Sequence, residues 1–247
     1  MKKISKLFLF VFIGVGLVSC GNEDLIEGSE STISVKNLEF IYNGITYSSP
    51  YTIEKDSILV IQDENVSALY EKLSNLPELA TYVNENGLEE YFDNSEVALQ
   101  QIINTSESNN LSLRVSGVNG TINLFADRNY KGRILGFNFS DGGLAIPDFG
   151  VYNYHDVASS LAVWATGGYM QGAAILYEHG NYGGRSIIFT FQPWDNIAHA
   201  PFTFRVPNLK EYIIRKPGLF NHSVSWEDFA SSLKVKLSDR GGVEQFQ

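Results

Sequence analysis

The feature that most constrains this 247-residue chain is an internal repeat in its carboxyl-terminal half. The segment 129–133 (NYKGR) recurs 52 residues later as 181–185 (NYGGR). An aromatic residue precedes the glycine of each copy by seven positions, and an Ala-Ser-Ser-Leu segment follows each copy, at 158–161 and 230–233. Matched features in the same order indicate two copies of one supersecondary unit.

The residues around each copy predict a β-hairpin that folds back over its own sheet. Ile122 and Leu124 alternate with polar neighbours, as do Leu233, Val235 and Leu237 in the last strand. A glycine at the hairpin corner adopts φ > 0 without steric cost, and an aromatic ring can then lie across it. The later serine offers its hydroxyl to backbone groups of the folded hairpin that otherwise lack partners.

This pattern of aromatic residue, six residues, glycine and a later serine resembles the Greek key motif of the βγ-crystallin family. The resemblance covers residues 119–238 and implies a domain of two motifs built as a pair of four-stranded sheets. We therefore expect a mainly β chain with a βγ-crystallin-like Greek key sandwich at 111–240. The resemblance implies these structural positions: Phe125, Gly132 and Ser160 in the first motif, and Tyr177, Gly184 and Ser232 in the second.

The second motif is longer than the first. Only 28 residues separate Gly132 from Ser160, whereas 48 separate Gly184 from Ser232. We place the extra residues, about 20, within 193–222, where the prolines favour a structured loop. Such a loop either carries a binding site, with Trp194 stacking on a sugar or anchoring a protein, or only covers a sheet edge.

The resemblance also suggests calcium binding. Many microbial members of the family bind Ca²⁺ through a segment Asn/Asp-Asn/Asp-x-x-Ser/Thr-Ser, with ligands exchanged between paired loops. The corresponding segments here are 155–160 (HDVASS) and 227–232 (EDFASS), which match at every specified position except the first. By resemblance the candidate ligands are Asp156 and Ser159 in one segment and Asp228 and Ser231 in the other.

The first position of each segment distinguishes the two. Glu227 keeps an oxygen ligand there, which makes the second segment the better candidate, since Ca²⁺ prefers six to eight oxygens. Imidazole is a poor Ca²⁺ ligand, so the first segment binds only if it uses the backbone of His155. In the alternative interpretation Asp156 and Asp228 only hold turns through side-chain hydrogen bonds.

The amino terminus reads as a targeting segment. Three lysines precede the apolar run 7–18, which has the length of a signal-peptide core and is too short to span a bilayer. Residues 17–20 (LVSC) resemble the lipobox of bacterial lipoproteins, in which the leader is cut before the cysteine and its sulfur is lipidated. We expect a signal peptide at 1–19, a lipid on Cys20, a tether at 20–32, and a location in the cell envelope at the outer membrane or cell surface. An ordinary secretory signal is the alternative.

Residues 33–104 read as a small α+β module, with Asn43-Gly44 and Asn86-Gly87 favouring hairpin turns. No nucleophile, metal cluster or phosphate-binding loop is recognisable in this module, and its acidic residues are typical of a solvated face. Residues 105–110 are the predicted linker to the crystallin-like domain.

Composition narrows the function. The formal charge of −10 disfavours nucleic-acid binding, and a single cysteine excludes a disulfide framework. No GxSxG, HExxH, P-loop or EF-hand pattern is present. We expect a lipid-anchored, non-enzymatic envelope protein whose crystallin-like domain binds calcium for stability. The alternative is a surface module that recognises a glycan, or a protein such as a protease, through the inserted loop; a hydrolase built on unassigned carboxylates is a third possibility.

Overall fold

The computed structural model describes residues 36–54, 58–84, 87–107, 117–166, 170–191, 202–214 and 224–239. All of them belong to the same unit of the chain, residues 33–247. The predicted signal peptide, Cys20 and its tether lie outside the described residues, and so do Trp194 and residues 108–110. Within the described ranges, no helix is long and apolar enough to cross a membrane.

Eight strands of the repeated half, four from each copy, build its two main sheets. The first copy contributes β6 (Asn119–Asp127), β7 (Lys131–Ser140), β8 (Leu144–Ile146) and β9 (Ser160–Thr166). The second contributes β10 (Met170–Tyr177), β11 (Ser186–Phe191), β12 (Phe202–Val206) and β15 (Ser232–Asp239).

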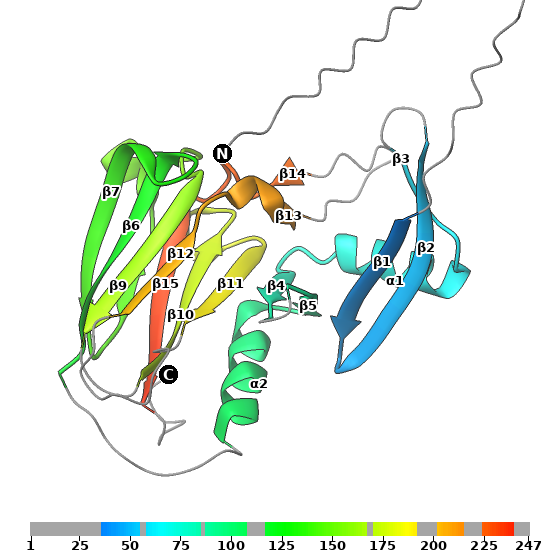
Figure 1. Cartoon of the computed structure of the whole chain (residues 1–247), viewed down its shortest axis with the longest axis horizontal. Helices are drawn as coiled ribbons and strands as arrows, with labels where there is room; N and C mark the ends of the chain where they lie inside the picture. The colour runs from blue at the N-terminus through cyan, green and yellow to red at the C-terminus, as the bar shows by residue number, and fades with distance from the viewer. Residues whose placement is uncertain are drawn as a thin grey trace, which may run out of the picture. The chain divides into compact units, whose positions relative to one another are not determined.

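The two copies exchange their third strands. One sheet has the order β12-β9-β6-β7, and the other contains the run β11-β10-β15-β8 (Figure 1). Strand β8 of the first copy therefore pairs with β15 of the second, and β12 of the second pairs with β9 of the first. The chain is mainly β, and the predicted two-motif Greek key sandwich is confirmed by this strand order.

The register repeats as closely as the order. Phe125 pairs with Ser160 in the first motif, and Tyr177 pairs with Ser232 in the second. The exchanged strands also correspond, because Ile146 faces the residue after Ser232 just as Val206 faces the residue after Ser160. The duplication inferred from the sequence is therefore a duplication of structure.

Each hairpin turns through the same left-handed backbone. The φ angles are 56°, 61° and 77° at Asn129, Tyr130 and Gly132, and 56°, 62° and 74° at Asn181, Tyr182 and Gly184. A Cβ atom at Gly132 would lie 2.6 Å from a carboxylate oxygen of Asp127, so glycine is required there both for its φ angle and for space.

The aromatic residue of each motif packs against the hairpin corner. Phe125 packs edge-on against Tyr130, with 5.7 Å between ring centroids. The equivalent pair in the second motif, Tyr177 and Tyr182, has the same 5.7 Å separation. The ring therefore fixes the tyrosine two residues before the glycine.

The two predicted structural serines close the hairpins. Ser160 Oγ donates to the Asp127 carbonyl oxygen (2.8 Å) and accepts from the Tyr130 amide (3.1 Å). Ser232 Oγ does the same with the His179 carbonyl (2.6 Å) and the Tyr182 amide (3.1 Å). Both serines have an exposed fraction of 0%. Each hydroxyl thus satisfies two backbone groups that the left-handed corner removes from the strand ladder.

The extra residues of the second motif are not one loop. Pro147 and Pro207 play the same part, since their carbonyls accept from the amides of Asn181 (2.6 Å) and Asn129 (2.8 Å). The offset between copies thus rises from 52 at the hairpins to 60 at these prolines and 72 at the serines.

Strand β12 therefore divides the predicted insertion 193–222 into two parts, of which residues 193–201 and 215–222 lie outside the described residues. Strand β12 belongs to the sandwich because it pairs with β9 and completes the four-stranded sheet. After the 3₁₀ turn Leu209–Glu211, the short strands β13 (Ile213–Ile214) and β14 (Val224–Ser225) flank the second part.

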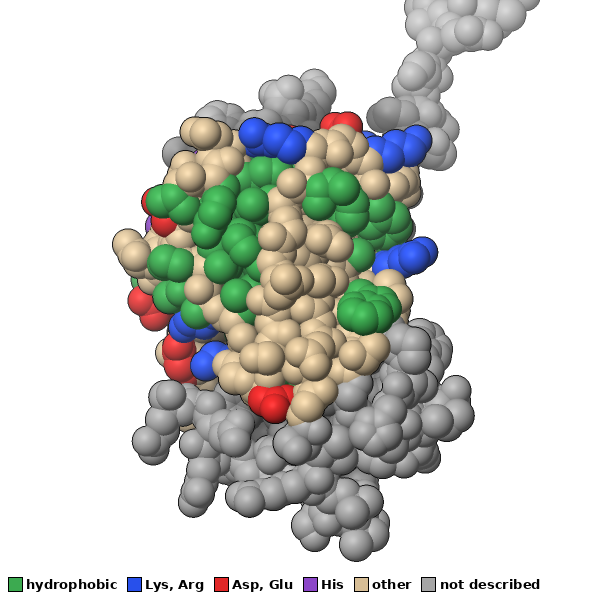
Figure 2. All heavy atoms as spheres, turned by 90° about the vertical axis from the view of Figure 1, so that its left-hand side faces the viewer, with side chains coloured by type: hydrophobic (Ala, Val, Ile, Leu, Met, Phe, Trp, Pro, Cys, Tyr) green, Lys and Arg blue, Asp and Glu red, His purple; other side chains and the backbone are tan. Residues whose placement is uncertain are grey.

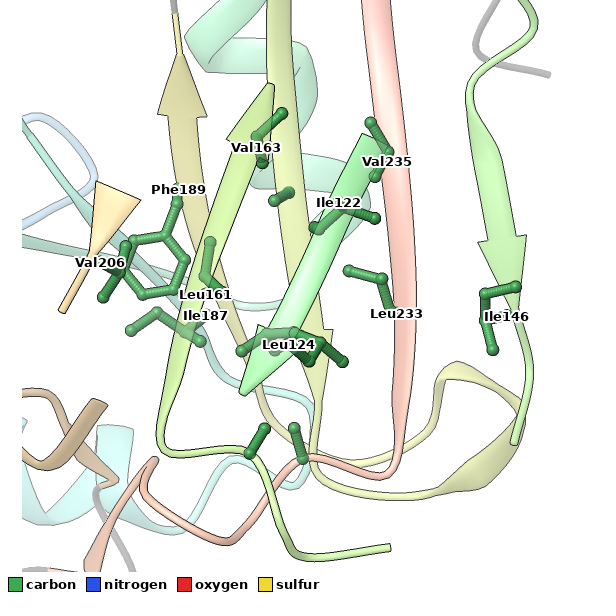
Figure 3. Packing of buried hydrophobic residues seen from close by; sticks show 14 of the residues in the cluster. Ile122, Leu124, Ile146, Leu161, Val163, Ile187, Phe189, Val206, Leu233 and Val235 are labelled. Carbon is green, nitrogen blue, oxygen red and sulfur yellow. The ribbon is translucent and has the colours of Figure 1, made fainter. Parts of the chain in front are cut away.

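The sandwich core is built from the inward faces of both sheets. Figure 3 shows side chains from the two sheets directed into the space between them: Ile122, Leu124, Leu161, Val163 and Val206 from one, and Ile146, Ile187, Phe189, Leu233 and Val235 from the other. Nearly all are less than 4% exposed. Removal of this apolar surface from water is the main stabilisation of the domain.

The amino-terminal segment has the predicted α+β character. Its elements are β1 (Lys36–Tyr42), β2 (Ile45–Glu54), β3 (Ile58–Ile61), α1 (Glu64–Ser74), β4 (Ala80–Val83), β5 (Glu89–Phe92) and α2 (Ser95–Glu107). Strands β1 and β2 form the hairpin expected at Asn43-Gly44, with φ angles of 52° and 72° at the turn. Strands β4 and β5 form the second expected hairpin.

This segment shares a sheet with the crystallin-like domain, although the sequence predicts two separate modules. Strand β4 pairs in parallel with β11, which produces a nine-stranded sheet. Beside this junction, Arg185 bonds the Ser74 carbonyl at the end of α1 (3.1 Å) and forms an ion pair with Glu178 (3.2 Å). Residues 105–107 of the predicted linker are the last turn of α2. An open edge at β11 would leave backbone groups unpaired, and β4 covers it.

Replacement of Ser160 or Ser232 by alanine is expected to lower the free energy of unfolding by about 2 kcal/mol or more, because each change leaves a buried carbonyl and a buried amide without partners. Urea unfolding of each variant measures this loss. Ser140→Ala, at an exposed position on β7, is the control and should change stability by less than about 0.5 kcal/mol. Equal stability of all three variants would show that the hydroxyls are dispensable.

Glu89 gives the fold a pH dependence. Burial raises the pKa of its carboxyl group, although the hydrogen bond from the buried Tyr91 hydroxyl opposes this. A carboxyl whose pKa is higher in the folded state contributes stability that is complete at low pH and is lost as the pH rises through the folded pKa. Glu89→Gln should therefore gain stability over the wild type as the pH rises above the ordinary pKa of a glutamate, about 4. Urea unfolding as a function of pH tests it, with the exposed Glu71→Gln as the matched variant; a difference independent of pH would contradict the prediction.

Candidate functional site

The two candidate calcium segments occupy equivalent turns that precede the last strand of each motif. Asp156 and Asp228 both adopt the left-handed conformation, with φ angles of 49° and 54°. The Asp228 amide donates to the Ala158 carbonyl (2.9 Å), and the Asp156 amide donates to the Ala230 carbonyl (3.4 Å). Each turn is therefore held by the backbone of the other motif.

The side chains also pair across the motifs. Ser231 Oγ donates to Asp156 Oδ1 (3.3 Å), and Ser159 Oγ donates to Asp228 Oδ1 (3.0 Å). We call Asp156 with Ser231 the first pair and Asp228 with Ser159 the second pair. The serines are 3–4% exposed, whereas both aspartates lie at the surface. The structure thus brings each candidate aspartate to the serine of the opposite segment.

The second pair has a positively charged neighbour. Arg128, in the hairpin turn of the first motif, makes two bonds to Glu227: Nε to Oε1 at 2.5 Å and Nη2 to Oε2 at 2.7 Å. The hydrogen bond from Arg128 is the main reason that the pKa of Glu227 is lowered. Both oxygens of Glu227 are engaged by the guanidinium, and the reason for preferring the second segment as a calcium site is therefore lost.

Asp228 lies in a strongly acidic environment. Partial burial is the first cause that raises its pKa, and the negative charges of Glu227 and Asp127 raise it further. The hydrogen bond from Ser159 and the charge of Arg128 oppose these effects. Three carboxylates thus share the field of one guanidinium at the second pair.

The first pair has a different neighbour. His155 Nδ1 lies 2.9 Å from Ser231 Oγ, and His155 Nε2 lies 2.8 Å from Asp148 Oδ1. Asp148 also accepts from the Gly150 amide and caps the 3₁₀ turn Phe149–Tyr152. The imidazole of His155 thus bonds Ser231, the serine of the first pair.

Calcium fits these two places unequally. Each pair supplies one carboxylate and one hydroxyl of the six to eight oxygens that Ca²⁺ takes, and carbonyls and water must supply the rest. Across the described part of the chain, no three His, Cys, Asp or Glu side chains are grouped so as to hold a metal ion. At the first pair the carboxylate of Asp148 is reached only through the imidazole of His155, so an ion there would take most of its oxygens from carbonyls and water. At the second pair a guanidinium already supplies positive charge.

Sequence reasoning missed Arg128 and Asp148. A signal for Arg128 was available, because the residue 52 positions later in the second copy is Gly180. Where one copy has a charged residue and the other has glycine at the aligned position, the two copies differ in the contacts that they can make there. Asp148 corresponds to Asn208, 60 positions later as for the two prolines, and Asn208 caps its own 3₁₀ turn.

The outer surface carries a further candidate region. Figure 2 shows hydrophobic side chains gathered on one face of the molecule, between scattered charged groups. Several large hydrophobic residues of the sandwich are well exposed: Ile134, Val151, Tyr152 and Trp164. The indole of Trp164 is 44% exposed on the outer side of β9. Its register neighbours, Thr121 on β6 and Thr203 on β12, place hydroxyl groups beside it.

Comparisons with known proteins add little to this picture. No protein-family model matches the sequence, and no curated protein matches it. Among solved structures, a βγ-crystallin from Ciona intestinalis is similar at 17% sequence identity, covering 47% of this chain and 99% of its own, with a TM-score of 0.27. The double Greek key therefore rests on the strand order, the register and the closing serines of this chain.

Proposed function

We propose that this chain is a lipid-anchored, non-enzymatic protein of the cell envelope whose crystallin-like domain binds Ca²⁺ between its two motifs and is stabilised by it. The observation that supports calcium binding is the exchange of Asp–Ser pairs between the motifs. Asp156 and Ser231 are 75 residues apart in the sequence and 3.3 Å apart in the fold. A cation held by both stabilises the folded state, because the unfolded chain does not bring the two residues together.

The anchor is the lipid on Cys20, followed by the polar tether. The chain is acidic, with a formal charge of −10, so anionic headgroups repel it and the acyl chains supply the membrane affinity. In this arrangement the domain faces a compartment outside the cytoplasm, where Ca²⁺ reaches concentrations that suit an affinity of roughly 10⁻⁴–10⁻³ M.

The test is thermal unfolding of the mature chain, with Cys20→Ser to keep it in solution. At about 10 mM Ca²⁺ the melting temperature should rise by roughly 3–8 °C, given the expected affinity and the size of the chain. Mg²⁺ at the same concentration should have a much smaller effect. Asp156→Asn should remove most of the Ca²⁺ response.

Asp141→Asn is the matched control, because Asp141 accepts from the Val118 amide (2.6 Å) just before β6 and belongs to neither pair. This variant should keep the full Ca²⁺ response, whatever its stability without the ion. An unchanged melting temperature of the wild-type chain in Ca²⁺ would reject calcium binding.

A second candidate function, glycan recognition, is favoured by the exposed Trp164. The face of an indole stacks on a sugar ring, and neighbouring hydroxyl and amide groups bond its polar rim. Thr203, Trp164, Thr121 and Asn138 form one continuous row across the four strands of the outer sheet face. This location differs from the inserted loop, where Trp194 lies outside the described residues.

Retention on insoluble polysaccharides tests the second candidate. Trp164→Ala should reduce the retained fraction of protein about tenfold or more, since stacking on an aromatic ring contributes about 1–2 kcal/mol. Ile134→Ala, an exposed apolar change on β7, should leave retention unchanged. Equal losses in both variants would indicate nonspecific adsorption, and no retention of the wild type would reject the candidate for the polysaccharides used.

A further inference from the structure

We propose that Arg128 is a built-in cation of the second pair, so that this pair needs no metal and Ca²⁺ binds at the first pair alone. The inference rests on the proposed function, because it specifies which of the two Asp–Ser pairs takes the ion. It also predicts that the two motifs of one duplicated domain differ in their calcium requirement.

The geometry of Arg128 supports this role. Its guanidinium forms the two bonds to Glu227 described above, which is the planar, paired arrangement that a lysine cannot make. Its positive charge also acts on Asp228 against the charges of Glu227 and Asp127. The cation that this acidic turn requires is thus supplied by the chain itself.

The second copy shows the same turn without the cation. The backbone of 179–182 repeats that of 127–130, with φ angles of 56° at both Asn129 and Asn181. The backbone amide of Asn129 bonds the Pro207 carbonyl, and that of Asn181 bonds the equivalent carbonyl of Pro147. The counterpart of Arg128 is Gly180, which has no side chain to reach the first pair.

The counterpart of Glu227 also differs. It is His155, whose side chain is 47% exposed and bridges Ser231 and Asp148. Because nearly half of this side chain is exposed, the imidazole can exchange its bond to Ser231 for water when an ion binds. The first pair therefore has the carboxylate of Asp156, a second carboxylate, Asp148, on the far side of the His155 ring, and no guanidinium among its described contacts.

At the second pair a Ca²⁺ ion would compete with the guanidinium of Arg128. Both bonds of this arginine must be given up before the Glu227 carboxylate can take an ion. An ion that binds such loops with an affinity of only roughly 10⁻⁴–10⁻³ M has little free energy with which to displace it. At the first pair there is no such competitor.

The repeat offers a matched exchange of residues as the experiment. Arg128→Gly gives the first hairpin the residue that the second copy carries at the same place, in a backbone that already accepts it. The reverse graft is His155→Glu with Gly180→Arg, which recreates the Arg128–Glu227 pair at the first pair. A Cβ atom at Gly180 would meet only the Pro147 carbonyl oxygen at 3.6 Å, an ordinary contact, so the arginine can be accommodated.

Isothermal titration with CaCl₂ on the mature Cys20→Ser chain gives the number of ions bound. We expect one for the wild type, two for Arg128→Gly, and none for the double graft. Adding Asp228→Asn to Arg128→Gly should remove the gained ion. Arg128→Gln, which keeps the stem of the side chain, should bind two ions as well and replaces Arg128→Gly if that variant does not fold.

Lys131→Gly is the control for charge. It removes one positive charge from the same hairpin and also introduces the residue of the second copy, Gly183, so it should still bind one ion. A second ion in this control, or the same number of ions in Arg128→Gly as in the wild type, would overturn the role of Arg128. A wild type that binds none while Arg128→Gly binds one would support Arg128 and reject binding at the first pair. No heat in any variant would reject both.

Discussion

The exchange of third strands is the constraint on which the rest of the domain depends. Neither motif has a complete four-stranded sheet until β8 and β12 cross to the partner sheet. The two turns that precede β9 and β15 are thereby placed against each other, and their aspartate amides bond carbonyls of the opposite motif. The Asp–Ser pairs are a direct consequence of this exchange, because each pair takes one residue from each motif. The candidate site therefore assembles when the sandwich folds.

Duplication has kept the backbone and changed the side chains. Arg133 and Arg185 occupy the same place in the two hairpins, yet Arg133 lies over the ring of Tyr154, 4.8 Å from its centroid, whereas Arg185 bonds the end of α1. One copy thus keeps its arginine within the sandwich, and the other uses it to hold the amino-terminal segment. Arg128 and its counterpart Gly180 differ in the same manner. The repeated fold thus has pairs of equivalent positions, and the side chains at the two positions of a pair make different contacts.

The parts of the structure that sequence predicts are those with local causes. The corner glycines and the closing serines follow from backbone groups that a tight hairpin leaves unpaired, and both are where the pattern places them. The pairing of β4 with β11 has no local cause, since two short strands that are about 100 residues apart carry no sign of each other. The sequence also does not reveal β12. The difference in length between the copies gives the number of extra residues, but it does not show that a strand separates them into two groups. Arg128 was missed because an exposed arginine in a turn is usually solvated.

The asymmetry between the pairs has a physical rationale in an acidic chain. A domain whose two turns both needed Ca²⁺ would have two acidic clusters without compensation whenever the ion was scarce, and their self-repulsion would favour unfolding. With Arg128 in place, the negative charge of the turn before β15 is partly compensated at any calcium concentration. Since that turn also bonds the backbone of the first motif, it holds the turn before β9 in its folded conformation. If an ion binds as proposed, the first pair is preorganised for it, so that binding would not have to order the loop as well.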